Sequence, residues 1–216
     1  MAIIVLDPGH GGVAKVGGSS PNNAVSVPRG ILEKTLTLKV AAYAKSVLQA
    51  AGHAVYLTRS TDVNVGLAAR AAVASTRKAD VFLSIHFNGW PKPTVQGTET
   101  FSFPGAPSRS ERLSKAVLGR VLPVTGYANR GAKFERYGVI NPANHLAITA
   151  AALLEISFIT DPREDARLTD ESYLRSLGQG IADGVTVYLA GEFPLAATRI
   201  VEDGFKAKTG GLSVAA

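Results

Sequence analysis

The segment IIVLDPGHGG, at residues 3–12, combines a run of β-branched and apolar side chains with an abrupt stop at proline and glycine. Residues 3–6 have the composition of a buried strand, and the DPG sequence at 7–9 is typical of the turn that ends one. His10 follows directly, between glycines that favour a tight turn. The segment therefore predicts the first strand of a sheet, with an imidazole presented just past its carboxyl end.

Helical and extended patterns alternate after this turn. Residues 32–51 carry apolar side chains at spacings of three and four and stop at Gly52, which predicts a helix. HAVYLT at 53–58 alternates like a strand, and alanine-rich residues 67–75 predict a second helix. DVFLSIHF at 80–87 is nearly all apolar, as in a strand covered on both faces. This β-α-β-α-β order predicts a largely parallel sheet with crossover helices.

The second half of the chain continues the pattern. GTETFSF at 97–103 predicts a strand, and residues 108–122 predict an amphipathic helix. Two further strands are expected at 139–140 and 150–156, and a closing helix with one apolar stripe at 170–189. The fold class expected is α/β: one three-layer domain whose twisted, mostly parallel sheet of about six strands carries helices on both faces.

Length and composition fit this picture. The 216 residues, 46% of them hydrophobic, suit one domain of the usual ~100–200 residues plus a short appendage. We expect the domain at residues 1–191 and a C-terminal tail or arm at 192–216, where the periodic pattern lapses. No stretch approaches the ~20 apolar residues of a membrane span, and the first residues lack a signal-peptide pattern.

Charge and cysteine content restrict the partners and the chemistry. A formal charge of +6 and a pI near 9.7 favour anionic partners such as phosphate-bearing wall polymers. The basic residues, Lys34, Arg70 and Arg120 among them, are scattered rather than gathered with aromatic residues, which argues for a solvated surface and against nucleic acid. With no cysteine, a metal would have to be held by His, Asp or Glu.

Four residues form a candidate catalytic group. His10, His86 and Glu155 each lie at or just past the carboxyl end of an expected strand, where the loops of parallel sheets gather ligands. Glu33 opens the helix after the His10 loop and so points toward the same edge. Two histidines and one carboxylate can hold a catalytic Zn²⁺ with an open position for water, and a second carboxylate can take the proton of that water.

The pattern leaves the roles of the two acids open. Glu33 as ligand with Glu155 as general base would complete the hydrolysis of an amide, and the reverse allocation is equally compatible with the spacing. Each of the four residues also has an ordinary structural interpretation, so the argument rests on their combination. The charge of Glu155 within AAALLEISF is the most unusual feature, because it is costly there without a partner. His53, which opens a strand away from these loops, is interpreted as structural.

Four segments, in order, resemble the signature blocks of the zinc-dependent N-acetylmuramoyl-L-alanine amidases of the third amidase family. They are VLDPGHGG at 5–12, GILEKTLTLKVA at 30–41, RAAVASTRKADVFLSIHFN at 70–88 and ALLEISFITDPRED at 152–165. The similarity extends from residue 3 to about residue 190. It departs at Asp161, where the family commonly has Asn, and in the TAAALL lead-in, which lacks the usual proline.

The resemblance implies a function and roles for single residues. His10, Glu33 and His86 match the three ligands of one Zn²⁺ per chain, and Glu155 matches the glutamate that activates the metal-bound water. The implied substrate is peptidoglycan, cut at the amide that joins the lactyl group of N-acetylmuramic acid to L-alanine of the stem peptide. Residues 1–191 would then be the zinc amidase catalytic domain.

We also expect substrate contacts from four residues outside that group: Asn88, Arg130, Asn144 and His145. Two other classes of protein are alternatives: a wall-binding module without catalysis, and another zinc hydrolase such as a carboxypeptidase-type peptidase. The presence of all four chemical residues argues against the first. The absence of an HxxE pair after either His10 or His86 argues against the second.

The expected place of action is the bacterial cell wall, in the periplasm or outside the cell, and the expected state is a monomer. A host wall-remodelling enzyme and a phage endolysin both fit the pattern. The missing signal-peptide pattern favours an endolysin, which would be held in the host cytoplasm before its release, or a trimmed chain.

Overall fold

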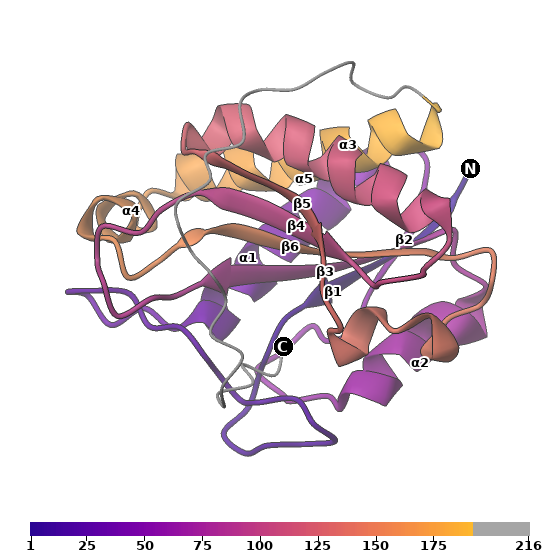
Figure 1. Ribbon diagram of the computed structural model, residues 1–216, viewed down its shortest axis with the longest axis horizontal. Helices are drawn as coiled ribbons and strands as arrows, with labels where there is room; N and C mark the ends of the chain where they lie inside the picture. Colours follow the sequence, from indigo (N-terminus) through magenta and orange to yellow (C-terminus); the bar gives the residue numbers. More distant parts are fainter. Residues whose placement is uncertain (192–216) are drawn as a thin grey trace.

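The computed structural model describes residues 1–191, so the expected tail at 192–216 lies outside the described residues. Figure 1 shows one twisted sheet with α3 and α5 along one face and α2 on the opposite face. Along the chain the elements are β1 (Ile3–Pro8), α1 (Glu33–Ala50), β2 (Ala54–Leu57), α2 (Leu67–Arg77), β3 (Val81–Asn88), β4 (Thr98–Ser102), α3 (Ser108–Thr125), β5 (Asn129–Phe134), the 3₁₀ turns η1 (Gly138–Ile140) and η2 (Pro142–Asn144), β6 (Ala150–Phe158), α4 (Pro162–Arg167) and α5 (Glu171–Leu189).

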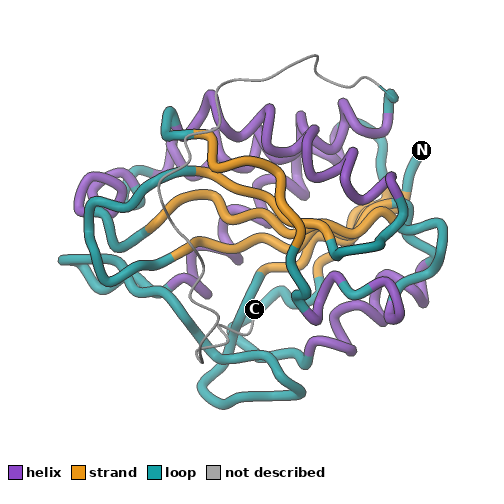
Figure 2. Tube along the Cα trace, in the orientation of Figure 1, coloured by secondary structure: helices purple, strands orange, loops and turns teal. Residues whose placement is uncertain are grey.

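The sheet has six strands in the order β2-β1-β3-β6-β4-β5. Strands β2, β1, β3 and β6 are parallel to one another, and β4 joins β6 in the antiparallel direction. Strand β5 is again parallel to β4 and forms one edge. Figure 2 shows these strands as a single orange layer between the helices. The predicted α/β class and mostly parallel sheet are confirmed.

Side chains of the central strands alternate between two apolar cores. In β3, Leu83 and Ile85 belong to the larger core, shared with α1, α3 and α5, whereas Phe82 belongs to the smaller core under α2 and η1. Strand β6 is divided in the same way, with Leu154 in the larger core and Leu153 in the smaller one. Both strands are buried on both faces, as their nearly continuous apolar sequences predict.

The smaller core does not cover its whole face of the sheet. Residues toward the amino ends of the parallel strands, such as Phe82, are packed under α2 and η1. The polar residues His86 and Glu155 follow on the same face, nearer the carboxyl ends of β3 and β6. The polar residues on this face therefore lie at the carboxyl ends of the strands, next to the loops that follow the strands.

One expected strand is wrong, and two elements were not predicted. Residues 139–140 form part of η1, and their apolar character reflects burial of Val139 and Ile140 in the smaller core rather than pairing in the sheet. The sixth strand is instead β5, whose sequence NRGAKF has too little apolar alternation to be recognised, because it lies at the sheet edge.

The short helix α4 was also missed, although its sequence carries a start signal. Asp161 accepts a hydrogen bond from the backbone N–H of Arg163, and Pro162 occupies the first helical position. Asn caps helices as well as Asp does, so the departure at Asp161 preserves this local structure. None of the helices within residues 1–191 is long and apolar enough to cross a lipid bilayer.

Candidate metal centre and active site

Three separate parts of the fold bring His10, Glu33 and His86 together. His10 follows β1, Glu33 is the first residue of α1, and His86 lies near the end of β3. All three side chains are buried, and their ligand-capable atoms lie within 4.8 Å of one another. Oε1 of Glu33 is 3.2 Å from Nε2 of His10 and 3.0 Å from Nδ1 of His86. The three residues expected from the sequence thus converge at the carboxyl edge of the parallel strands.

The turn around His10 explains the glycines of the PGHGG sequence. His10 itself has a left-handed backbone, with φ of 62°. A Cβ atom on Gly9 would lie 2.2 Å from Cε1 of His86, so only glycine lets the backbone approach that imidazole. Gly9 therefore leaves the space that the imidazole of His86 occupies.

A buried arginine, Arg70, binds the backbone of this turn. Arg70 donates hydrogen bonds to the carbonyl oxygens of Pro8 and His10, each 2.8 Å long, and forms a 2.8 Å ion pair with Asp7. Burial alone would raise the pKa of Asp7, but the attraction of Arg70 and two hydroxyl donors lower it, so the carboxyl stays ionised. The expectation that Arg70 belongs to a solvated basic surface is therefore wrong, since only 1% of the residue is exposed.

A second buried arginine supports the same segment. Arg59 donates from Nε to the carbonyl oxygen of Pro8 at 3.0 Å and from Nη2 to that of Gly9 at 2.9 Å. Burial and repulsion by Arg70 lower the pKa of Arg59 to about 10, which still leaves it charged at neutral pH. Sequence reasoning missed both arginines, because nothing in the pattern separates a buried guanidinium from an exposed one.

The electrostatics of the cluster suit a cation. Burial tends to raise the pKa of Glu33, but the attraction of His10 and a hydrogen bond from Nδ1 of His86 lower it, so the carboxylate is charged. Burial tends to lower the pKa of His10, and Glu33 more than offsets this and raises it. For His86, burial dominates and lowers the pKa, which favours the neutral imidazole that metals bind.

The donor atoms also fit a metal. Nδ1 of His10 lies 3.1 Å from the carbonyl oxygen of Ser20, which can only accept, so this nitrogen carries the proton and Nε2 keeps its lone pair. Nε2 is buried, faces Glu33, and makes no well-formed hydrogen bond with the described residues. A buried ring nitrogen of this kind beside a carboxylate and a second imidazole is the donor set that Zn²⁺ prefers.

Glu155 lies next to this cluster. It pairs with His86 in the register between β6 and β3, and its Oε2 is buried without a hydrogen-bond partner among residues 1–191. Burial, followed by repulsion from Glu33 and Glu99, raises its pKa well above the ordinary value. The close group of ligand-capable atoms contains Glu33 and excludes Glu155, a distinction that the sequence spacing left open.

A second carboxylate, Glu99, lies beside Glu155 and was not predicted as part of the site. The two acids pair in the antiparallel register of β4 and β6. Glu99 accepts hydrogen bonds from Nδ2 of Asn88 at 2.9 Å, from Nε of Arg130 at 3.1 Å and from Nζ of Lys133. Asn88 on β3 and Arg130 on β5, two of the expected substrate contacts, thus lie around Glu99, one strand and two strands away from Glu155. The sequence placed Glu99 in a strand but gave no sign of the strand that it faces.

The structure does not bring the other two expected contacts to the cluster. Asn144 accepts a hydrogen bond at its carbonyl oxygen from Ser75 in α2, and the ring of His145 lies 4.7 Å from that of Phe82. Phe82 precedes His86 by four residues, about 13 Å along a strand. Their distance from the cluster has a simple reason: a loop that leads into β6 lies at the amino ends of the parallel strands, opposite the site.

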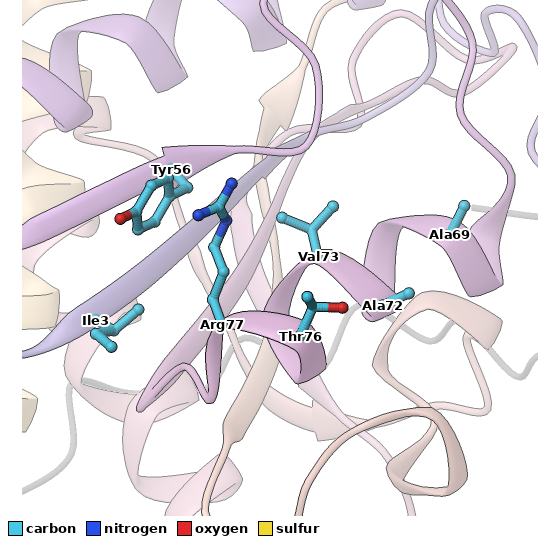
Figure 3. A pocket seen from close by; sticks show the side chains of 7 residues that line it. All are labelled: Ile3, Tyr56, Ala69, Ala72, Val73, Thr76 and Arg77. Carbon is cyan, nitrogen blue, oxygen red and sulfur yellow. The ribbon is translucent and has the colours of Figure 1, made fainter.

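A shallow hollow on the surface is also separate from the cluster. It lies between α2 and the edge of the sheet near β2, and Figure 3 labels its seven lining side chains. Arg77 places its guanidinium carbon 3.6 Å from the centre of the Tyr56 ring and occupies part of this hollow. None of the candidate site residues lines it.

The fold and the buried His-Glu-His group define a class, that of α/β proteins with a candidate metal centre at the carboxyl ends of parallel strands. Residues 4–187 match the family model described as N-acetylmuramoyl-L-alanine amidase, and the chain belongs to this family.

Solved structures include close matches to this fold. The catalytic domain of CwlV, an N-acetylmuramoyl-L-alanine amidase from Bacillus (Paenibacillus) polymyxa var. colistinus, is 34% identical with a TM-score of 0.77, covering 88% of this chain and 99% of that one. An N-acetylmuramoyl-L-alanine amidase from Clostridium difficile 630 is 28% identical with a TM-score of 0.78, covering 88% and 98%.

Relatives known by sequence are longer proteins. A protein of Staphylococcus epidermidis named "Probable cell wall amidase LytH" is 32% identical over 87% of this chain and 58% of its own length. The N-acetylmuramoyl-L-alanine amidase AmiC of Neisseria meningitidis is 29% identical over 87% of this chain and 52% of its own length. The chain thus spans about half the length of the curated relatives it matches.

The environment of Glu155 generates a prediction about stability. Glu155→Gln is expected to raise the free energy of unfolding of the metal-free protein at neutral pH by about 1–3 kcal/mol, because a buried carboxylate without a partner is destabilising. The folded-state pKa lies above the unfolded value near 4.5. Below that value both states are protonated and the gain vanishes, whereas it grows as the pH rises above it.

Urea unfolding of both proteins in the presence of a chelator, at a series of pH values from 4 to 8, measures this difference. Glu135→Gln is the matched control, because Glu135 is an exposed glutamate and its replacement should leave stability nearly unchanged. If the Glu155→Gln variant is equally or less stable than the unaltered protein at pH 7, the carboxylate of Glu155 does not destabilise the fold.

Proposed function

We propose that this chain is a zinc-dependent hydrolase that cleaves the amide between N-acetylmuramic acid and L-alanine in peptidoglycan. Residues 1–191 form the catalytic domain, His10, Glu33 and His86 hold one Zn²⁺, and Glu155 exchanges protons during the reaction. The observation that carries the proposal is the buried His-Glu-His group with an unpartnered carboxylate beside it. Membership of the amidase family supports the choice of bond.

A Zn²⁺ ion bound by such a group supplies a Lewis acid, which polarises a carbonyl oxygen and makes water a nucleophile near neutral pH. Glu155 then acts on the protons of the reaction. Its carboxylate accepts the proton that the attacking water loses and returns it to the departing amine of L-alanine. A raised pKa suits both transfers, because a general acid and base works best when its pKa is near the operating pH.

The rest of the site keeps these groups in place. Arg70 and Arg59 fix the carbonyl oxygens of the turn before His10, so the imidazole is held before any metal binds. Asn88 and Arg130, at the Glu99 side of the site, are proposed to contact the substrate. The chain is proposed to act at the bacterial cell wall as a monomer, in keeping with a relative that is named as a cell wall amidase.

The central test identifies the bond that is cut. Incubation of the protein with purified peptidoglycan and Zn²⁺ is expected to release stem peptides with a free L-alanine amine and to leave intact glycan strands. Mass spectrometry of the soluble fragments measures this outcome. A chelator should stop the reaction, and added Zn²⁺ should restore it. Fragments that are cut within the peptide or within the glycan would show that the protein hydrolyses a different bond, and would refute the proposed function.

The ligand assignment predicts the loss of metal. His10→Ala and His86→Ala are each expected to bind no Zn²⁺ at micromolar supply, because a three-residue site that loses one ligand binds far more weakly. Metal analysis of the purified variants measures this loss. His53→Ala is the control, since the ring of His53 accepts a hydrogen bond from the backbone N–H of Ala2, outside the cluster. Full zinc occupancy in both cluster variants would refute the assignment.

The role of Glu155 predicts a loss of turnover without a loss of metal. Glu155→Gln is expected to keep Zn²⁺ and to lower kcat by about 10²- to 10⁴-fold, because an amide cannot accept the proton. Turnover on purified peptidoglycan and metal content are measured in parallel with those of Glu33→Gln. If Glu155→Gln loses the metal and Glu33→Gln keeps it, the two acids have the opposite roles.

A further inference from the structure

The sheet continues beyond Glu155 as an ordered row of positions on one face. His86 pairs with Glu155, Glu155 with Glu99, and Glu99 with Gly131 of β5. The row thus runs from the metal ligands, through the proton-accepting residue and a second carboxylate, to a position without a side chain. Gly131 is buried, but a Cβ atom on it would meet nothing within 4 Å, so there is room beside Glu99.

Two cationic side chains, those of Arg130 and Lys133, come from either side of Gly131 in the chain. Arg130 and Lys133 both donate to Oε2 of Glu99, which is only 4% exposed. The ammonium group of Lys133 is held by its ion pair with Glu99. The Lys133 side chain is nevertheless 41% exposed to solvent. An ammonium group has three N–H donors, and the hydrogen bond to Glu99 uses one of them.

The opposite side of the cluster has a different charge pattern. There Lys34 forms a 2.8 Å ion pair with Asp62, which also accepts the backbone N–H of Gly12, so charge is balanced. Lys133, by contrast, offers a partly exposed positive charge on the β5 side to an anionic group that enters the site. The nearby Glu135 is exposed, and its carboxylate accepts a hydrogen bond from the backbone N–H of Arg136.

The distance between Glu155 and the ammonium group of Lys133 indicates which part of the substrate can contact Lys133. Glu99 is one strand from Glu155 and β5 is two strands away, which places the ammonium about 5–10 Å from the Glu155 carboxylate. An extended peptide covers about 3.4 Å per residue, so this span corresponds to two or three residues from the scissile amide. In a peptidoglycan stem peptide, the residue after L-alanine carries a carboxylate that is either free or amidated.

We propose that Lys133, held in position by Glu99, binds the free carboxylate of the residue that follows L-alanine in the stem peptide. Lys133 is a specificity-determining residue, and the enzyme prefers stem peptides in which this carboxylate is not amidated. Glu99 is a positioning residue, because it fixes the ammonium through a hydrogen bond rather than touching the substrate. The inference rests on the proposed amidase function and adds the substrate group that the site selects.

The test uses two synthetic N-acetylmuramyl peptides that differ only in a free carboxylate or a carboxamide on the residue after L-alanine. The unaltered protein is expected to show a KM about 5- to 10-fold lower for the carboxylate form, the range of a partly exposed charged hydrogen bond. Lys133→Met should raise the KM for that form by the same factor. It should leave kcat, and the KM for the carboxamide, within twofold.

Two further variants separate binding from a general structural effect. Lys133→Arg retains the positive charge and should keep most of the preference. Lys115→Met is the matched control, because Lys115 also pairs with a glutamate, Glu111, but lies on α3 at the other face of the sheet. It should change neither KM. Thermal unfolding confirms that each variant is folded, and Lys133→Gln replaces Lys133→Met if the latter is not.

Each outcome decides the question. Equal KM values for the two peptides in the unaltered protein, or equal increases for both in Lys133→Met, would overturn the carboxylate subsite and leave the amidase function intact. Failure of the unaltered, zinc-loaded protein to cleave either peptide would overturn the proposed function and the subsite with it.

Discussion

The buried ion pair between Asp7 and Arg70 joins β1 to α2 beneath the turn that carries His10. The same guanidinium also holds the carbonyl oxygens of Pro8 and His10, so one side chain fixes both the end of the strand and the turn after it. Buried ion pairs contribute little net stability, because desolvation offsets most of their attraction. The value of this pair lies in geometry: it holds a left-handed residue, His10, where Glu33 and His86 can meet it.

The site itself works against stability. Glu155 interrupts an apolar strand, and its raised pKa records the cost of ionising it among buried neighbours. The surrounding strands offset this cost, since β3 and β6 are buried on both faces along most of their length. Glu99, one strand away, accepts hydrogen bonds from Asn88, Arg130 and Lys133. The two adjacent glutamates thus have different surroundings: three donors bind the carboxylate of Glu99, whereas Oε2 of Glu155 is buried without a hydrogen-bond partner among the described residues.

Several errors of sequence interpretation share one cause, which is that sequence patterns report burial more directly than pairing. Val139 and Ile140 are buried, and this made a 3₁₀ turn resemble a strand. The real edge strand β5 is half polar and was missed. Asn144 and His145, which are expected to contact the substrate, precede β6 and therefore lie at the amino ends of the parallel strands, away from the metal cluster. The residues at the carboxyl ends, His10 and His86, were placed correctly for the same topological reason.

The sequence by itself determined the α/β alternation, the strand ends that carry His10, His86 and Glu155, and the glycines of the turn, because these depend on local composition and period. Only the tertiary structure decided which acid joins the histidines, that Arg59 and Arg70 are buried, and that Glu99 gathers Asn88, Arg130 and Lys133 beside Glu155. Strand order and register set these contacts, and they arise between segments far apart in the chain. No local pattern encodes them, because the free energy of such contacts depends on neighbours that exist only once the sheet has formed.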